Sequence, residues 1–546
     1  MKTIAVIEAD LNQSPIGTAS RLAEELANET VLRRTVRRAL EAKLGDVHLV
    51  CPADQRTRVE QLVAGLDVAV QTHNVGPPPY RQMVRTCRKW ALDSWRGGIS
   101  GSCAFDESVH CAVLAAIAKN ENADAVVSIP AAAVLLDPTL ARQMADHFAL
   151  HAESMRLTFA QAPPGMVGTW YMTSFLEELG HAGYPPGALV NYAPEKPQFD
   201  FVVKDCCYKV PPSIAGAWGR LLADTRRAAE RCNAAIADLG HQLTGDAAAV
   251  TLAKWLRRRE NQHLDDLPQE VEIELTTDDQ WANSTLRPRG KLLERTATID
   301  PQLVEKIARE MAAYDDSAVV LGGFGEPLLH PQFEQIVAAC KQAGIFALAI
   351  RTNALAMDQA TIDMLMKHDV DVVTAMIDTT DAEIYRRLHG LDGYEQAVEN
   401  TRRLAAQRIE RTQIRPIVVP EMIKTKTTYG QMEAFFDEWI RTAGWAVIAG
   451  YSDYGRLLPD EQVMNLAPPV RAACVRIRRR TIVLADGRVL PCDQDPRGTN
   501  PIGNLASDSL ASIWQSPEMQ NLRASHDNAH FDPLPICPPC TEWHRP

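Results

Sequence analysis

The chain has 546 residues, of which 46% are apolar and 23% charged, and its formal net charge at pH 7 is −12. A length of this kind usually corresponds to about three to four domains. No apolar run reaches about 18 residues, so we expect no membrane span and no membrane partner, and the acidic balance argues against general binding to nucleic-acid phosphates.

The first residues, MKTIAVIEAD, place an acid directly after a short apolar run. This pattern indicates a buried first strand and not a secretory signal, which needs a longer apolar stretch and a cleavage site of small residues. We therefore expect a cytoplasmic protein. Its 12 cysteines should then serve as metal ligands or free thiols and not as disulfides.

Residues 1–240 alternate short apolar runs with helical stretches. The runs are TIAVIEA, DVHLVCP and DAVVSIP, and the helical stretch VLRRTVRRALEAKL lies between the first two. This alternation predicts a mostly parallel sheet covered by helices. Residues 241–268 are helix-like and then polar, which indicates a linker between domains.

A second series of strands and helices occupies residues 269–465. Its apolar runs are VEIELT, SAVVLGG, FALAIRTN, VDVVTAMID and IRPIVVP, with helical segments such as DPQLVEKIAREMAAY between them. The series predicts a complete or partial β/α barrel, whose chemistry would lie at the carboxyl ends of the strands. Residues 466–546 change character to short strands, turns and cysteines.

Four cysteines near the end of the chain form two pairs. Cys474 and Cys492 flank a predicted hairpin with Gly487 at its tip, and Cys537 and Cys540 form a CxxC turn. A CxxC turn holds two thiolates on one side of a metal, and the hairpin can bring up two more. Four such thiolates suit an iron–sulfur cluster or a structural zinc. The alternative is four buried free thiols, since cysteine is often fully buried.

Residues 269–546 resemble a known family, the radical S-adenosylmethionine (SAM) proteins with a C-terminal SPASM or "twitch" domain. The resemblance rests on the turn GGFGEP at 322–327, RTN at 351–353, MID at 376–378 and the cysteine pattern. It implies a SAM pocket and an auxiliary-type [4Fe–4S] cluster. The implied cofactor-binding residues are Gly323, Gly325, Glu326, Asn353 and Asp378, and the implied cluster ligands are Cys474, Cys492, Cys537 and Cys540.

The residues of the GGFGEP turn agree with this implication. Glycines after a strand let the backbone approach a ligand, and Glu326 offers a carboxylate to an ammonium group. The alternative interpretation is a tight turn in which Glu326 begins a helix. Asp378 has a similar alternative as a strand-end cap.

The loop after the first barrel strand departs from the family. Radical SAM proteins carry a CxxxCxxC motif there, whereas residues 277–290 read TDDQWANSTLRPRG. Asp279, Asn283 and Leu286 stand at the three ligand positions, and these side chains replace soft thiolates poorly or cannot ligate iron. We therefore expect no SAM-cleaving cluster. The pocket either binds SAM or another ligand, or is a retained scaffold whose mouth is lined by some of Trp281, Arg287 and Arg289.

Residues 1–240 resemble the nucleotide-sugar cytidylyltransferases of the GT-A fold, through residues 4–10, 26–40 and 128–138. The phosphate-binding loop of that family is replaced by residues 12–21. Ala132 stands where the family has a metal-binding aspartate, so nucleotidyl transfer should be lost. We expect Asp137 to cap a helix ahead of Pro138. A further metal site is a lesser alternative, at Cys103, Cys111, Cys206 and Cys207.

Three functions follow from these observations. The first is an iron–sulfur protein of radical SAM/SPASM type that holds one [4Fe–4S] cluster, or zinc in its place, and does not cleave SAM. The second is a non-catalytic scaffold or ligand-binding protein, and the third is a cytidylyltransferase with an accessory C-terminal half. We expect an α/β protein of the first kind, with an electron donor or another protein as its partner.

Overall fold

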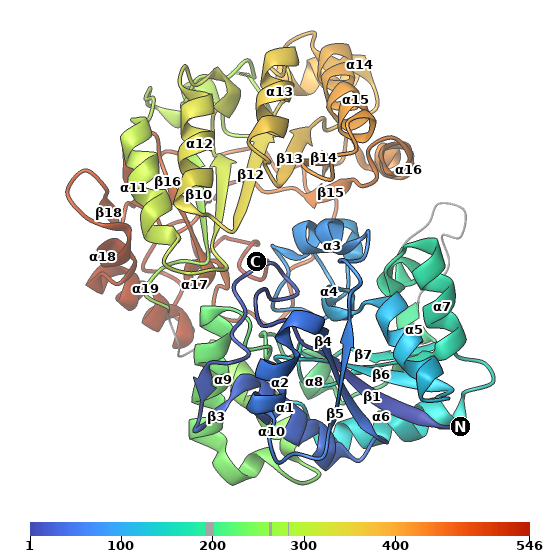
Figure 1. The fold of residues 1–546 in the computed structure, drawn as a ribbon. Coiled ribbons are helices and arrows are strands. Elements are labelled where there is room, and N and C mark those ends of the chain that lie inside the picture. Colours follow the sequence, from blue (N-terminus) through green and yellow to red (C-terminus); the bar gives the residue numbers. More distant parts are fainter. Residues whose placement is uncertain (192–200, 261–264, 282, 546) are drawn as a thin grey trace. The chain divides into compact units, whose positions relative to one another are not determined.

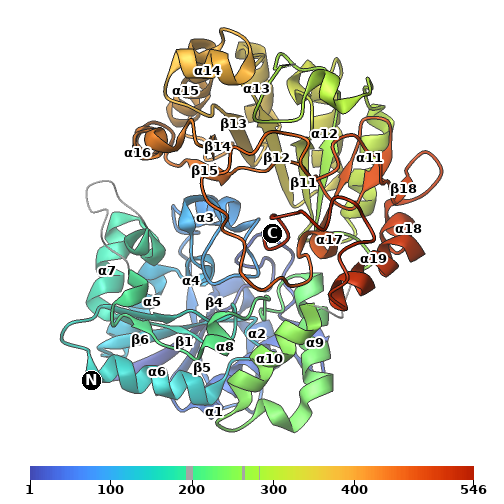
Figure 2. The same cartoon turned by 180° about the vertical axis from the view of Figure 1, so that it is seen from behind.

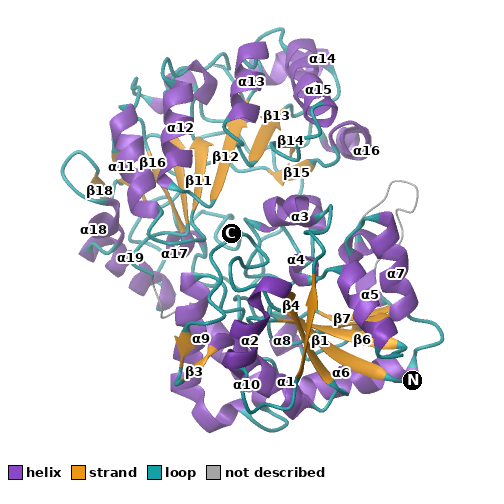
Figure 3. Ribbon diagram, viewed as in Figure 1, coloured by secondary structure: helices purple, strands orange, loops and turns teal. Residues whose placement is uncertain are grey.

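The computed structural model describes residues 1–191, 201–260, 265–281 and 283–545. The chain divides into two compact units, Met1–His263 and Leu264–Pro546. Each unit is a sheet with helices, which confirms the predicted α/β class (Figure 3). None of the described helices is both long and apolar enough to cross a bilayer.

The first unit is built on a seven-stranded sheet in which β1 (Thr3–Glu8) lies between β4 (Val47–Pro52) and β6 (Ala125–Pro130). Both neighbours run parallel to β1, so the strand order reverses there. The sheet order is β5-β4-β1-β6-β8-β7-β9, and β8 is antiparallel to its neighbours. The other strands are β5 (Ala69–His73), β7 (Leu157–Ala160), β8 (Thr169–Met172) and β9 (Cys207–Tyr208), and the small pair β2 (Glu25–Leu26) and β3 (Glu29–Thr30) stands apart.

Helices cover both faces of this sheet because successive residues of a strand point to opposite sides. Ile4 and Val6 join one apolar cluster, whereas Ala5 and Ile7 join the other. Figure 1 shows these helices in blue to green. They are α1 (Val31–Ala42), α2 (Arg56–Leu62), α3 (Arg81–Arg88), α4 (Ala104–Ser108), α5 (Cys111–Asn120), α6 (Pro138–Leu150), α7 (Thr173–Ala182), α8 (Pro212–Ala215), α9 (Arg226–Leu239) and α10 (Ala248–Glu260).

The second unit contains a nine-stranded sheet of order β15-β14-β13-β12-β11-β10-β16-β17-β18. The strands from β10 to β15 are parallel, and no pairing among the described residues joins β15 to the other edge, so the barrel is partial. Its strands are β10 (Glu270–Glu274), β11 (Ala318–Gly322), β12 (Ala347–Thr352), β13 (Val372–Met376), β14 (Ile417–Lys424), β15 (Val447–Gly450), β16 (Arg480–Val483), β17 (Arg488–Leu490) and β18 (Gly503–Asn504).

The helices between the parallel strands follow one another around the outside of the sheet (Figures 1 and 2). Val271 and Ile273 of β10 face the apolar core under these helices, whereas Glu272 and Glu274 alternate with them and face the other side. The helices are α11 (Pro301–Met311), α12 (Phe333–Ala343), α13 (Gln359–Lys367), α14 (Ala382–His389), α15 (Tyr394–Glu410) and α16 (Met432–Ala443), followed by α17 (Arg476–Arg479), α18 (Leu510–Trp514) and α19 (Pro517–Asp527).

The cysteine-bearing segment continues the barrel sheet. β16 pairs in parallel with β10, from Glu270 opposite Arg480 to Ile273 opposite Val483, and β17 and β18 extend the sheet as antiparallel strands. The change of character near residue 466 is therefore not a break in the sheet. A parallel strand at an edge carries unpaired backbone groups, and β16 satisfies those of β10.

Candidate functional site

The hairpin predicted between Cys474 and Cys492 is present. Cys474 precedes α17, Cys492 follows β17, and Gly487 turns the hairpin with a φ of +84°. Cys537 and Cys540 form a turn closed by the Cys540 N–H, which donates to the Cys537 carbonyl at 3.1 Å. Cys474, Cys492 and Cys537 are each 7–8% exposed, so the thiols are largely shielded from water.

Cys474 lies close enough to the other three thiols to influence each of them. Burial raises the pKa of Cys492 and Cys540, and raises that of Cys537 to about 12; in each case a Cys474 thiolate raises it further. Among the described residues, no three His, Cys, Asp or Glu side chains converge on a single metal ion. A [4Fe–4S] cluster is larger than a single ion, and its four thiolate ligands stand around it without meeting at one point. A set of four cysteine thiols has the chemistry that such a cluster requires.

Positive charge and a hydrogen-bond donor surround the thiols. Arg476 ion-pairs with Asp493 at 2.5 Å and with Glu542 at 3.4 Å, and the Glu542 N–H donates to the Cys540 sulfur at 3.3 Å. Arg471 donates to the Cys537 carbonyl at 2.7 Å. Bonds to sulfur and nearby charge are the means by which a protein sets the potential of a bound cluster.

The GGFGEP turn is packed against its own chain. A Cβ on Gly325 would stand 1.9 Å from the Thr276 carbonyl oxygen, and one on Gly323, where φ is +79°, would stand 2.7 Å from Glu274 Cβ. The Glu326 N–H donates to the Asp278 carbonyl at 2.8 Å. The glycines therefore serve the close approach of the loop after β10, and no open cradle remains above them.

Glu326 is fully buried, and hydrogen bonds within the chain occupy its carboxylate. Oε1 accepts from the Thr352 hydroxyl at 2.7 Å and from the Leu328 N–H at 3.1 Å, and Oε2 accepts from the Asn353 N–H at 2.8 Å. Burial, followed by the charge of Asp279, raises the pKa of Glu326 to about 7. In this structure Glu326 caps the 3-10 helix η7 (Pro327–Leu329), which was the alternative interpretation of the turn.

The loop that lacks cysteine inserts two arginines into the barrel. Arg287 donates to Asp378 and to Glu421, each at 2.7 Å, and all three side chains are at most 10% exposed. Burial opposes the charge of Asp378, but Arg287 and His389 outweigh it and lower the pKa of Asp378 to about 2. Arg289 pairs with Asp279 at 3.0 Å. Asp378, Glu421 and Asp279 are thus each paired with an arginine of this loop.

The remaining loop residues also face partners from the same unit. Trp281 is fully buried, stacks on His389 with ring centroids 3.8 Å apart, and donates to the Tyr385 hydroxyl at 3.0 Å. Leu286 is buried in an apolar cluster, whereas Asn283 is exposed. The positions that correspond to CxxxCxxC therefore lie in unlike surroundings and do not face a common centre.

The space left at the barrel mouth is small. Arg287, Arg289, Arg351, Tyr454 and Asp493 are among the residues that line a cavity of about 30 Å³. One water needs about 10–15 Å³ of such space, so the cavity holds about two waters, whereas pockets for drug-sized ligands span about 300–1,000 Å³. In this cavity the described residues leave too little room for SAM, and we derive no step through it.

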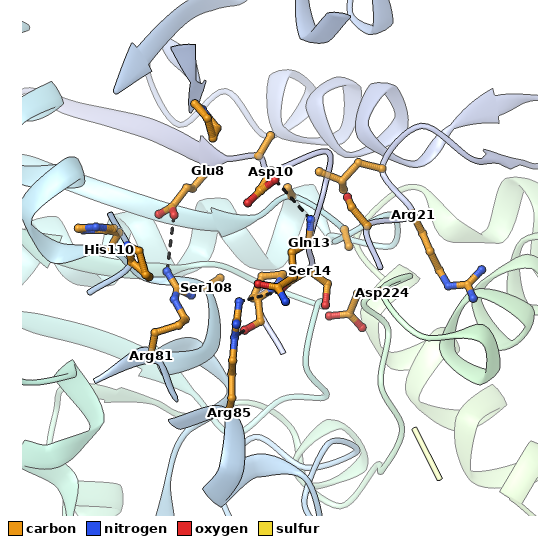
Figure 4. Close-up of a pocket in the computed structure, with 18 of the residues that line it drawn as sticks. Glu8, Asp10, Gln13, Ser14, Arg21, Arg81, Arg85, Ser108, His110 and Asp224 are labelled. Atoms are coloured by element: carbon orange, nitrogen blue, oxygen red, sulfur yellow. Dashed lines mark hydrogen bonds and ion pairs between the residues drawn. The ribbon is translucent and has the colours of Figure 1, made fainter. Parts of the chain in front are cut away.

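A larger hollow lies in the first unit, where the parallel strands end. A cavity of about 230 Å³ is lined by residues at or just beyond the carboxyl ends of β1, β4, β5 and β6 and by residues of α3. Figure 4 shows Glu8 and Arg81 facing one another, with Arg85 beside Ser14. The reversal of strand order at β1 is the place where open α/β sheets bind ligands.

Several expectations for the first unit can now be compared with the structure. Asp137 caps α6 by accepting from the Leu140 N–H at 2.7 Å, as predicted. Ala132 lines the cavity, and so does Arg21 at the end of the loop of residues 12–21. Cys103, Cys111 and Cys207 are buried in one apolar cluster, against which Cys206 packs, and no metal-binding group is found among the described residues.

Two family models match parts of the second unit. The Radical SAM superfamily matches residues 285–426, and the SPASM iron-sulfur cluster-binding domain matches residues 474–541. These matches confirm the two domain types expected from the GGFGEP turn and the cysteine pattern. Together they leave the first unit uncovered.

Individual relatives match only part of the chain. An uncharacterized protein of Treponema pallidum is 24% identical over 252 residues, which are 44% of this chain and 68% of that protein. The tungsten-containing aldehyde ferredoxin oxidoreductase cofactor-modifying protein of Pyrococcus furiosus is 29% identical over 137 residues, 24% of this chain and 38% of that protein. This chain thus spans well under half the length of the second relative.

Among solved structures, Streptococcus suis SuiB bound to precursor peptide SuiA has a TM-score of 0.40 at 15% identity, covering 52% of this chain and 73% of that one. A cytidylyltransferase from Leptospira borgpetersenii has a TM-score of 0.31 at 16% identity, covering 47% of this chain and 95% of that one. Both values are too low to carry an argument about this chain.

The candidate residues thus fall into two groups. Gly323, Gly325, Glu326, Asn353 and Asp378 are brought together around the barrel mouth, where bonds within the unit engage the polar side chains. The four cysteines form the second group. Sequence reasoning missed Glu421, the second carboxylate bound by Arg287, and the pair Arg81 and Arg85, whose spacing of four residues on a helix was an available signal.

Proposed function

We propose that this chain, in which a domain of radical SAM type precedes an iron–sulfur cluster-binding domain, holds one [4Fe–4S] cluster at Cys474, Cys492, Cys537 and Cys540 and does not cleave SAM in its barrel. The barrel then serves as a scaffold for the cluster-bearing tail. The observation that carries the proposal is the contrast between three thiols that each interact with Cys474 and a barrel mouth into which Arg287 and Arg289 project.

The residues around the thiols have defined roles in this proposal. A bound cluster would supply one-electron redox chemistry. Arg476, which also pairs with Asp493 and Glu542, places a positive charge beside Cys474 and Cys492, and the Glu542 N–H orients the Cys540 sulfur. Cys474, packed in the apolar cluster with Ile477 and Trp514, shields the site from water.

Anaerobic reconstitution followed by iron and sulfide analysis tests the cluster. We expect about four irons and four sulfides per chain, since a [4Fe–4S] cluster is held by four thiolates. The variant Cys537→Ser should lose most of the iron. Cys340→Ala is the matched control, because Cys340 is a fully buried thiol of the barrel core, and it should keep the full iron content.

Two results would contradict this part of the proposal. About eight irons per chain would place a second cluster in the barrel. Stoichiometric zinc after expression in iron-replete, anaerobic medium would assign the four thiolates to a structural zinc site instead.

Calorimetric titration with SAM tests the barrel. We expect no heat of binding to the reconstituted protein, because the cavity at the mouth holds about two waters. Saturable binding of SAM, together with 5′-deoxyadenosine after reduction, would show that the loop opens and that the barrel is active.

A further inference from the structure

We infer that the cavity of the first unit binds a small organic anion that also carries hydroxyl groups. Its anionic group would lie against Arg85, and its hydroxyl groups would donate to Glu8 and pair with Ser20. This inference goes beyond the cluster, since every residue that lines the cavity belongs to Met1–His263.

The anionic end of the proposed site is defined by Arg85. Its Nε donates to the Pro15 carbonyl at 2.8 Å and its Nη2 to the Ser14 carbonyl at 3.2 Å, and no carboxylate among the described residues forms an ion pair with it. Burial, followed by the charge of Arg81, lowers the pKa of Arg85 to about 10. Arg85 is half-buried, and a partly desolvated cation without a paired anion is costly, so a ligand carboxylate or phosphate would relieve that cost.

The wall of the cavity also offers acceptors without partners. Glu8 Oε2 and Ser20 Oγ are buried atoms that make no hydrogen bond within the described chain. The other carboxylate oxygen of Glu8 stands 3.6 Å from Arg81 Nη2. A buried polar atom without a partner lowers stability, so ligand hydroxyls that reach Glu8 and Ser20 would be bound favourably.

The loop of residues 12–21 is not arranged to cradle a polyphosphate. Its backbone donors are used internally: the Ser14 N–H by the Thr18 carbonyl, the Gly17 N–H by the Ser14 carbonyl, and the Thr18 N–H by the Ser14 hydroxyl. Arg85 donates hydrogen bonds to two carbonyl groups of this loop. A phosphate-binding loop presents free N–H groups to the ligand, so this site suits one anionic group and not a triphosphate.

The other two carboxylates of the wall, Asp10 and Asp224, already have partners within the unit. Asp10 Oδ1 accepts from the Asn12 N–H at 2.8 Å and from Gln55 Nε2 at 2.9 Å, and Asp224 pairs with Arg220 at 2.6 Å. Ala131 and Ala132, just beyond β6, offer no carboxylate. The volume of about 230 Å³ lies below the range of about 300–1,000 Å³ for drug-sized ligands, which indicates a small metabolite.

Calorimetric titration of the reconstituted full chain tests the inference with defined probes. Glycerol 3-phosphate and glycerate carry an anion and hydroxyls, phosphate carries the anion alone, and glycerol carries hydroxyls alone. We expect at least one of the first two to bind at least tenfold more tightly than phosphate, and glycerol to give no heat. The stronger of the two identifies the anion as a phosphate or a carboxylate.

Two variants test which residue binds the anionic group and which binds the hydroxyl groups. Arg85→Gln should weaken binding of the preferred probe and of phosphate at least tenfold. Glu8→Gln should weaken the preferred probe alone, to near the affinity of phosphate. Arg156→Gln is the control for the loss of one arginine, because Arg156 lies on the surface of the same unit, paired with Glu178, and it should bind as the unaltered chain does.

The inference would be overturned if neither hydroxylated anion binds, or if these probes bind only as tightly as phosphate does. It would also be overturned if both Arg85→Gln and Glu8→Gln bind the preferred probe with unchanged affinity. Tight binding of CTP with Mg²⁺ in preference to every probe would also overturn it, because it would show a polyphosphate site. Glu8→Gln keeps the test decisive if Arg85→Gln does not fold, and none of these outcomes depends on the cluster.

Discussion

In both units the parallel strands end at a position where α/β proteins often bind ligands. This position is nearly filled in the second unit and hollow in the first. At the barrel mouth the loop after β10 sends Arg287 and Arg289 inward, and about 30 Å³ remains. In the first unit the loop after β1 folds on itself and leaves about 230 Å³. Strand topology provides a position for a site in both units, but the loop that follows the strand decides whether it is hollow.

Removing Arg287 should have the largest effect on stability among the changes proposed here. Arg287→Ala leaves Asp378 and Glu421 buried without their cation, and breaking a buried pair in this way costs about 3–5 kcal/mol. Chemical denaturation of the second unit measures the loss. Arg386→Ala, at a side chain 58% exposed, should change stability by less than about 0.5 kcal/mol. Equal stability of the two variants would mean that the arginine is not a structural part of the mouth.

Gly325→Ala should have the next largest effect. The added Cβ would meet the Thr276 carbonyl oxygen at 1.9 Å, and forcing an extra carbon into packed structure costs about 1–3 kcal/mol. The matched control is Gly430→Ala, since no atom lies within 4 Å of a Cβ built there. The free energy of unfolding should fall in the first variant alone. A well-folded Gly325→Ala that gains SAM binding would contradict our account of the turn.

The titration of Glu326 should be visible as a smaller effect. Its pKa is about 7 when folded, against an ordinary value of 4.5, so the folded chain holds a proton that the unfolded chain releases. Its contribution to stability is present below pH 4.5 and is lost as the pH rises through 7, by at most about 1.4 kcal/mol per pH unit. Glu326→Gln should remove this slope when unfolding is measured from pH 5 to pH 8. Parallel curves for the two proteins would contradict the raised pKa.

Glu8→Gln should have the smallest effect on stability. Burial raises the pKa of Glu8, so replacing the carboxyl by a neutral amide removes a cost, and we expect a gain or no change within about 1 kcal/mol. Glu107→Gln provides the contrast in the same unit. Glu107 pairs with Arg88 and Arg220, each at 2.7 Å, and the two cations outweigh burial and lower its pKa, so that variant should be less stable. A clear loss in Glu8→Gln would indicate that Glu8 supports the fold.

Local patterns in the sequence were enough to predict the strands and turns that position both places. The runs TIAVIEA, DVHLVCP and DAVVSIP correspond to β1, β4 and β6, and the Gly487 hairpin and the Asp137 cap form as expected. These features depend on alternation and on turn and cap chemistry over a few residues. The family matches over 285–426 and 474–541 agree with the motifs of the second unit.

The filling of the barrel mouth could not be predicted in the same way. Arg287 meets Glu421, 134 residues further along the chain, and Arg85 meets the Ser14 carbonyl, 71 residues before it. Such pairs depend on how distant loops fold over the strand ends, which no local pattern records. The addition of β16 to the edge of β10 was missed for a similar reason, because a short strand after a change in composition gives no sign of its partner.

The pairing of β16 with β10 ties the state of the sulfur ligands to the integrity of the barrel. Only a few residues separate Cys474 from Arg480, where that strand begins, so if the proposed cluster is bound, a tail that loses it would loosen this parallel strand as well. Depletion of iron or exposure to oxygen would then expose the edge of the sheet at β10 to proteases and to pairing with other chains.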